Sequence, residues 1–483
     1  MRSWLWLGLG LVVACGAEPA VEGEVADASS PVNGSDASDE DGGVDAASPS
    51  SDSGDATIPV DARARDDADA PTRDTGAQPT ADANATRDDA GSADGGLVWP
   101  NAESRANSDP WLVSHHDGIA RLEPRVLVID LEATPSERAM TLVDKHIKAL
   151  AEASSFHKYK EPSAQPALVY QLVKIVQAQK GARIDYGAWN TQAFADQNLQ
   201  IKDPAEPNGP NLTLCGLFER GLINEVWCMA SSDPKCGETQ ESKQVYDASG
   251  KPVANRFANA SNGASITALG CKVTARITDF NSGRGAGCHQ HAMGHAWERY
   301  MDSNAVPMLA KQAKRFLNWD LNTRVGAPFN SFYGACNSNG TQLTDCIVWE
   351  SNVRARSGAS ASRSFDIADL SAGCGNAHFY ANTTGTYSYD TNTPDPEVLS
   401  SCENYGLHNG AGGKDLTTPY TNAMTDRLYG RSVRDCPATQ PACDDDCGGH
   451  GTTYLYQNFP GPGTKATNDD GTPMHNWWAY LFY

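Results

Sequence analysis

The sequence lacks several features whose absence excludes classes of protein. No serine stands in a G-x-S-x-G motif, and the glycine-rich stretch NSGRGAG (281–287) does not match a phosphate-binding loop. The N-terminal apolar run, Trp4 to Ala14, has 11 residues, whereas a membrane-spanning helix needs roughly 20. There is no basic excess, because the net charge is −22. The sequence therefore predicts neither a serine hydrolase, a P-loop enzyme, a membrane-spanning protein nor a nucleic-acid-binding protein.

Aromatic residues are absent between Cys15 and Trp99. The stretch from Gly16 to Gly96 has 20 acidic and 4 basic side chains, so it accounts for −16 of the net charge of −22. Such a segment cannot bury enough apolar surface to offset its ordering entropy, and its like charges extend it. We expect residues 15–97 to be a disordered acidic tether, followed by a globular domain at 98–483.

Cysteine is also absent between Cys15 and Cys215, and 12 cysteines then follow from Cys215 to Cys447. This even number predicts disulfides and an oxidising compartment. The paired C-x₂-C spacings of structural zinc sites are missing. The connectivity stays open, although short spacings favour three neighbouring pairs: Cys228–Cys236, Cys336–Cys346 and Cys443–Cys447.

The N-terminus has the pattern of an export signal. Arg2 precedes the apolar run, which is the length of a signal-peptide core and ends in V-V-A-C. This ending resembles the lipobox of bacterial lipoproteins over residues 1–15. The resemblance implies a signal peptide at 1–14 and an acylated Cys15 that anchors the chain in a lipid bilayer. In bacterial lipoproteins an aspartate after the acylated cysteine often retains the protein in the inner membrane. Because this chain has Gly16 there, the resemblance also implies an outer-membrane or cell-surface location.

The globular part is expected to have an α/β fold. Strands interleaved with helices predict a mixed sheet with helices in the first half, and the Gly-, Asn- and Cys-rich second half predicts loops joined by disulfides. Apolar spacing predicts a helix at 136–154, capped by Thr134 or Ser136. Further predicted elements are strands at 125–133, 167–177, 346–351 and 476–483, and a helix, a glycine stop at Gly221 and a strand within 215–229.

The stretch GCHQHAMGHAWERYMDS (287–303) concentrates the candidate site. In a helix that starts near Cys288, His291, His295 and Glu298 fall within about 60° of one another, and Asp302 extends this stripe by one turn. The apolar side chains gather on the other side, where they are expected to face the core: Met293, Trp297, Tyr300 and Met301. The stripe is therefore expected to face solvent or a cleft roofed by later loops.

Two histidines at i and i+4 can bind one zinc ion. Glu298 is the candidate third ligand, orienting residue or catalytic general base, and Asp302 or His378 could add a ligand. The segment HAMGH resembles the H-E-x-x-H helix of zinc metallopeptidases, which implies His291 and His295 as ligands. The general-base glutamate of that family is replaced by Ala292, which puts its water activation in doubt. The alternatives are an ion-paired polar face and a buried structural network.

A second candidate centre lies at Glu225, which follows Asn224 at the start of a predicted strand. An Asn-Glu pair in an α/β protein is found in sugar-cleaving enzymes, which need a second carboxylate about 5–9.5 Å away. The candidates for this partner are Asp130, Glu132 and Asp279.

Four short segments resemble secreted bacterial proteins of no assigned activity: INEVW (223–227), GHAWE (294–298), GNAHFY (375–380) and NWW (476–478). This resemblance implies one coherent domain and no particular chemistry. Two functions therefore remain open. One is a metal-dependent, surface-anchored hydrolase of peptide or glycan polymers. The other is a non-catalytic surface module that binds a glycan or protein partner.

Overall fold

The computed structural model describes most of the chain from residue 96 onward, and every structural statement below concerns those residues. The described ranges are 96–178, 183–230, 239–280, 282, 285–317, 319–320, 347–351, 354–357, 364–366, 374–377, 379–380, 398–400, 402–407, 418–420, 449–462 and 464–483. Cys15 and the predicted tether up to residue 95 lie outside them, whereas Leu97, the last residue of the predicted tether, is the first residue of strand β1. The expected domain boundaries remain predictions.

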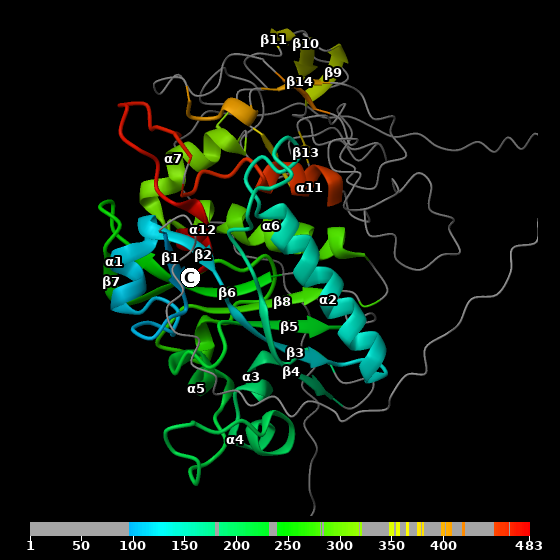
Figure 1. Ribbon diagram of the computed structural model, residues 1–483, viewed down its shortest axis with the longest axis vertical. Coiled ribbons are helices and arrows are strands. Elements are labelled where there is room, and N and C mark those ends of the chain that lie inside the picture. Colours follow the sequence, from blue (N-terminus) through cyan, green and yellow to red (C-terminus); the bar gives the residue numbers. More distant parts are fainter. Residues whose placement is uncertain are drawn as a thin grey trace, which may run out of the picture. The chain divides into compact units, whose positions relative to one another are not determined.

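A six-stranded mixed sheet forms the centre of the fold, with strand order β4-β3-β5-β8-β6-β7 (Figure 1). The neighbouring strands β4, β3, β5 and β8 are parallel, whereas β6 runs antiparallel to β8 and to β7. This sheet confirms the predicted α/β class. The strands are β3 (Arg125–Asp130), β4 (Gln171–Gln177), β5 (Glu225–Met229), β6 (Thr239–Tyr246), β7 (Pro252–Asn259) and β8 (Ala275–Phe280).

Helices cover both faces of the sheet (Figure 1). Helix α6 packs on β6 and β8, and α2, α7 and α11 contact α6. Helices α3, α4 and α5 lie on the opposite side (Figure 1). The helices are α1 (Pro110–His115), α2 (Ser136–Ala153), α3 (Tyr186–Trp189), α4 (Gln192–Phe194), α5 (Leu214–Glu219), α6 (Ala286–Ser303), α7 (Pro307–Phe316), α11 (Gly449–Tyr456) and α12 (Trp477–Phe482), with short turns η1 (His116–Gly118), η2 (Ala195–Leu199), η3 (Thr267–Leu269) and η4 (Cys402–Asn404).

The sequence of β3 explains its central position. Val126 and Val128 belong to the core on the α6 side, while Leu127 and Ile129 belong to the core on the α5 side. A parallel strand with both faces buried has a continuous apolar run rather than an alternating one. The run RVLVID therefore fits the middle of the sheet, as the sequence predicted.

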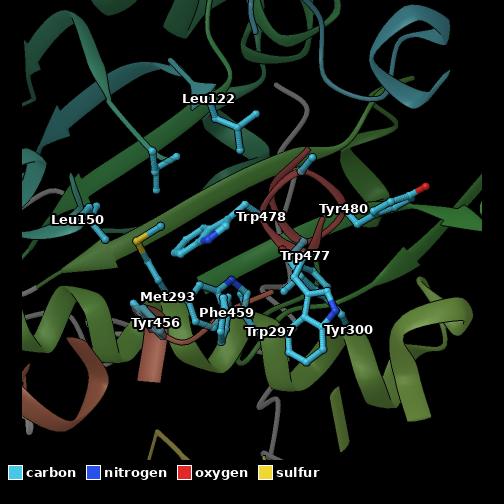
Figure 2. Close-up of a cluster of buried hydrophobic side chains, with 14 of the residues drawn as sticks. Leu122, Leu150, Met293, Trp297, Tyr300, Tyr456, Phe459, Trp477, Trp478 and Tyr480 are labelled. Atoms are coloured by element: carbon cyan, nitrogen blue, oxygen red, sulfur yellow. The ribbon is translucent and has the colours of Figure 1, made fainter. Parts of the chain in front are cut away.

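Aromatic side chains dominate the core on the α6 side. Figure 2 shows Trp297 of α6 beside Tyr456, Phe459 and Trp478, which come from the C-terminal part of the chain. The ring of Trp297 lies 3.9 Å from that of Tyr456 and 4.3 Å from that of Phe459, measured between centroids. This packing joins the C-terminal segments to the central helix.

The remaining described strands form small sheets. They pair as β1 with β2, β10 with both β9 and β11, β12 with β13, and β14 with β15. Their bounds are β1 (Leu97–Trp99), β2 (Ile119–Leu122), β9 (Ile347–Ser351), β10 (Arg354–Ser357), β11 (Ser364–Asp366), β12 (Gly375–Asn376), β13 (Phe379–Tyr380), β14 (Val398–Ser400) and β15 (Thr418–Tyr420).

The structure confirms the predicted presence of disulfides in the globular part of the chain. Cys215 is bonded to Cys271 and Cys374 to Cys402, and Cys288 is also disulfide-bonded. Each short-range pair expected from spacing includes at least one cysteine outside the described residues, so those pairings remain predictions. None of the described helices is long and apolar enough to cross a bilayer.

Two local predictions were wrong. The aromatic segment at 476–483 is not a strand but contains helix α12, in which Trp477, Trp478 and Leu481 are all buried. Because apolar residues point in every direction, the sequence has no periodicity that distinguishes helix from strand. Helix α2 begins after Pro135, and no side chain caps it, so neither Thr134 nor Ser136 has the expected capping role.

Candidate functional site

Helix α6 brings His291, His295 and Glu298 onto one face, as the sequence predicted. The helix follows Gly285, which has an extended backbone, and ends at Asn304 in the left-handed conformation. All three side chains are buried, with exposed fractions of 6% for His291, 5% for His295 and 1% for Glu298. The stripe therefore does not face open solvent. A later segment contacts it at Glu298 through the backbone of Ala377, and the expected cleft remains a prediction.

Glu298 holds His295 in a defined orientation. The Nδ1 atom of His295 lies 2.8 Å from Oε2 of Glu298, and the backbone N–H of Ala377 donates to the second oxygen, Oε1, at 3.1 Å. The His291 ring lies beside that of His295, with centroids 4.5 Å apart and planes at 85°. The sequence predicted the neighbouring histidines and the glutamate, but not the contact from Ala377.

Burial keeps His295 neutral. It lowers the pKa of His295 from 6.5 to about 3, and the positive charge of Arg299 acts in the same direction. In a neutral imidazole only one nitrogen carries a proton, and the contact with Glu298 assigns that proton to Nδ1. The lone pair is then on Nε2, which is the tautomer required of a metal ligand or a general base.

The described residues do not complete a metal site. They include no group of three His, Cys, Asp or Glu side chains arranged to hold a metal ion. Both oxygens of Glu298 already accept hydrogen bonds, which fits an orienting residue better than a third ligand. His378 and the side chain of Asp302, the additional predicted ligands, lie outside the described residues.

The structure explains why HAMGH departs from the zinc-peptidase motif. Ala292 is fully buried, and its carbonyl oxygen accepts a hydrogen bond from Oγ1 of Thr239 on β6. A Cβ atom on Gly294 would meet Oη of Tyr456 at 2.9 Å and Cβ of Ala377 at 3.3 Å. Both positions thus require small residues for packing. A glutamate at either position would be forced into a packed interior.

His289, the first histidine of α6, lies in the core. Its ring makes edge contacts with Trp227 of β5 at 4.6 Å and with His146 of α2 at 4.7 Å. Burial lowers the pKa of His289 well below 6.5. His289 therefore belongs to the packing between the helices and the sheet, away from the His295–Glu298 pair.

Glu225 lies in the core, with its carboxylate held by hydrogen bonds. Its carboxylate is buried and accepts four hydrogen bonds, from Tyr170 (2.6 Å), Trp227 (3.1 Å), Thr278 (3.0 Å) and Tyr483 (3.2 Å). These four donors fix the position of the carboxylate in the core. We call Glu225 a structural hub in this sense, a buried acceptor shared by four donors.

The candidate partners of Glu225 lie elsewhere. Asp279 is bonded to Tyr186, a residue of the core on the other side of the sheet. Glu225 pairs in register with Val126, whereas Asp130 pairs with Met229, four residues further along the strand. At roughly 3.3 Å per residue this is about 13 Å, beyond the distance that a carboxylate pair requires. Glu132 lies two residues after Asp130, beyond the end of β3.

The core on the α6 side also contains a buried charge network that the sequence did not predict. Arg276 of β8 lies 3.1 Å from Glu241 of β6 (Nε to Oε2), and Tyr300 of α6 is hydrogen-bonded to both. Lys243 lies 3.9 Å from Glu241. Burial lowers the pKa of Lys243 to about 7 and raises that of Glu241. The segment TQESKQVY (239–246) begins with six polar residues and has no apolar alternation, so the sequence has no signal for a buried strand here.

No family model matches the chain, and no curated protein matches it. The site therefore has to be interpreted from its own geometry.

Proposed function

We propose that the chain is an exported, lipid-anchored cell-surface hydrolase of extracellular peptide or glycan polymers, with its reactive centre at His295. The observation that supports this proposal is the contact between His295 and Glu298, next to the ring of His291. A carboxylate that fixes the tautomer of a histidine is a recurring feature of hydrolytic centres, both with and without metal.

The two histidines give the site its proposed chemistry. His295 presents Nε2 as a base or ligand, and His291 is close enough to contribute a second imidazole. A zinc ion bound there would lower the pKa of a bound water to about 7 and polarise the scissile carbonyl or acetal. Glu298 would orient His295, because both of its oxygens are already engaged. His378 remains the predicted additional ligand.

Metal analysis of the purified full-length protein tests this proposal. We expect about one zinc ion per chain, and loss of that ion together with hydrolysis of casein or cell-wall glycan in His291→Ala and His295→Ala. His475→Gln is the matched control, because His475 pairs with Asp117 at the surface. A protein that contains no zinc and takes none up would contradict metal-dependent hydrolysis.

The proposed anchor has a separate test. Mass spectrometry of the mature N-terminus should find an acylated Cys15 after removal of residues 1–14, and Cys15→Ala should release the protein from the membrane fraction. An unmodified Cys15 in the mature chain would contradict lipid anchoring.

A non-catalytic surface module is the second candidate, and the burial of the stripe favours it. A polymer cannot reach side chains that are 5% and 1% exposed unless covering segments move. In this case His295→Ala should change stability only. Trp111, partly exposed and stacked on His115 with centroids 4.2 Å apart, is then the candidate contact for a glycan or protein partner. Binding that survives Trp111→Ala would argue against this role.

A further inference from the structure

Lys243 is a lysine in the interior of the protein. It belongs to β6, against which α6 packs, and its side chain is fully buried. Lysine is almost never fully buried unless its ammonium group is paired. Within the described part of the chain, however, Nζ of Lys243 makes no hydrogen bond. The three N–H donors of a protonated Lys243 would therefore be poorly satisfied at this position.

The carboxylate beside Lys243 is that of Glu241, and its charge is already engaged by another cation. Oε2 of Glu241 lies 3.1 Å from Nε of Arg276 and accepts a hydrogen bond from Tyr300. Arg276 is also attracted by the charge of Glu225 on β5. Oε1 of Glu241 lies 3.9 Å from Nζ of Lys243, which is too long for a hydrogen bond. This ion pair therefore offsets only part of the cost of burying a charged Lys243.

The neighbouring elements surround Lys243 with groups that carry no negative charge or have a charge of the same sign. From α6, the ring of Tyr300 lies 5.1 Å from Nζ, measured to its centroid. From β8 comes the positive charge of Arg276, and from β7 the uncharged Ala258, which pairs in register with Lys243. From η1, His116 is close enough for the charge of Lys243 to lower its pKa. None of these four groups adds a second carboxylate.

We propose that Lys243 is a pH switch built into the fold, which makes the chain more stable above neutral pH, where the buried amine is uncharged, than below it, where the amine carries a proton. The switch acts where α6, the helix of the candidate site, packs on the sheet, because Tyr300 belongs to that helix. The inference depends neither on a metal ion nor on hydrolysis.

The direction of the effect follows from the protons bound in the folded and unfolded chains. Burial lowers the pKa of Lys243 from 10.5 to about 7; the charge of Glu241 opposes this shift and that of Arg276 adds to it. In the unfolded chain the amine is hydrated and has its ordinary pKa. Between pH 7 and 10.5 the unfolded chain therefore binds more protons than the folded one, and stability rises with pH. One such group changes the folding equilibrium constant by up to about tenfold per pH unit.

Urea unfolding of the full-length protein at pH 7.5 and pH 9.0 tests the switch. Lys243→Met keeps the length of the side chain and removes the titrating amine. The folding equilibrium constant of the wild type, divided by that of Lys243→Met, should rise about 20-fold between these pH values. The matched control is Lys251→Met, an exposed lysine in the turn between β6 and β7, for which the ratio should stay within twofold. A rise below fivefold for Lys243→Met would overturn the proposal.

A second test uses the wild-type protein alone and decides the matter if Lys243→Met does not fold. In NMR of the full-length protein with ¹³C-labelled lysine, the Cε signal of Lys243 is identified by its contact with the ring of Tyr300. This signal should titrate with a midpoint between pH 6 and 8. A Lys243 signal that keeps its ammonium position up to pH 9 would overturn the proposal. Neither readout depends on zinc or on activity, so a failed metal analysis would reject the proposed function without affecting this result.

Discussion

Glu225 is the residue whose removal should most weaken the fold. Its carboxylate accepts hydrogen bonds from Tyr170, Trp227, Thr278 and Tyr483, and all of these side chains are buried. The donors come from separate parts of the chain: the residue before β4, β5 itself, β8 and the segment after α12. A change at Glu225 therefore affects contacts across the whole core on the α6 side.

The size of the effect depends on the substitution. Glu225→Ala leaves four buried donors without an acceptor, at about 1–3 kcal/mol each, so we expect a loss of at least about 4 kcal/mol in the free energy of unfolding. This is a large fraction of the roughly 5–15 kcal/mol of a typical domain. Glu225→Gln keeps an oxygen for the donor-only indole of Trp227 and lets the Tyr170 and Tyr483 hydroxyls turn to accept. We expect it to cost about 2–4 kcal/mol, because charge-assisted bonds become neutral ones.

Urea unfolding followed by tryptophan fluorescence, with the disulfides intact, measures both losses. Glu161→Gln is the control, because Glu161 is exposed, and it should stay within about 0.5 kcal/mol of the wild type. A stability loss below about 1 kcal/mol in Glu225→Ala would refute the role of Glu225 as a hub.

Three further predictions concern burial and pH. Ala292→Glu, which restores the peptidase motif in sequence, should destabilise the protein by about 3 kcal/mol or more and should not create activity, since Ala292 is fully buried; wild-type stability in urea would contradict this. Burial lowers the pKa of His116 from 6.5 to about 3, so between these two pH values the unfolded chain binds more protons than the folded one. The free energy of unfolding should therefore decrease as the pH is lowered from 6.5, by at most about 1.4 kcal/mol per pH unit from this residue. His116→Phe should flatten that slope in urea titrations between pH 6.5 and 4, and an unchanged slope would contradict the assignment. Asp117 raises the pKa of the half-exposed His475, so this ion pair stabilises the fold below pH 6.5, and the stabilisation is lost as the pH rises through the raised pKa. His475→Gln should lower the free energy of unfolding by less than about 1 kcal/mol at pH 5.5 and leave it unchanged at pH 9. An equal loss at both pH values would contradict this role of the pair.

Long periodic segments could be predicted from the sequence. The helix predicted at 136–154 matches α2 closely, because its apolar spacing is sustained over several turns. The strands predicted at 125–133 and 167–177 correspond to β3 and β4, but β3 already ends at Asp130 and β4 begins only at Gln171. The segment at 476–483 was misread, since a short run of buried aromatics has no preferred period. Its helical form is fixed by packing against α6 and α7, which a single sequence does not reveal.

The candidate site was predictable only in part. Helical spacing placed His291, His295 and Glu298 together, and the structure agrees. The sequence left open whether these side chains face solvent or are covered, because a contact such as that of Ala377, 79 residues from Glu298, depends on the tertiary fold. The charged pair Glu241 and Arg276 was missed because the run TQESKQ (239–244) is polar throughout, and only the tertiary fold encloses it.

The central claim is that His291 and His295 form a metal-dependent hydrolytic site. The zinc content of the full-length protein, measured beside that of the His291→Ala/His295→Ala double variant, tests it most directly. We predict one zinc ion per wild-type chain and none in the double variant, with both proteins folded. Zinc-free wild-type protein, or equal zinc in the two proteins, would contradict the claim.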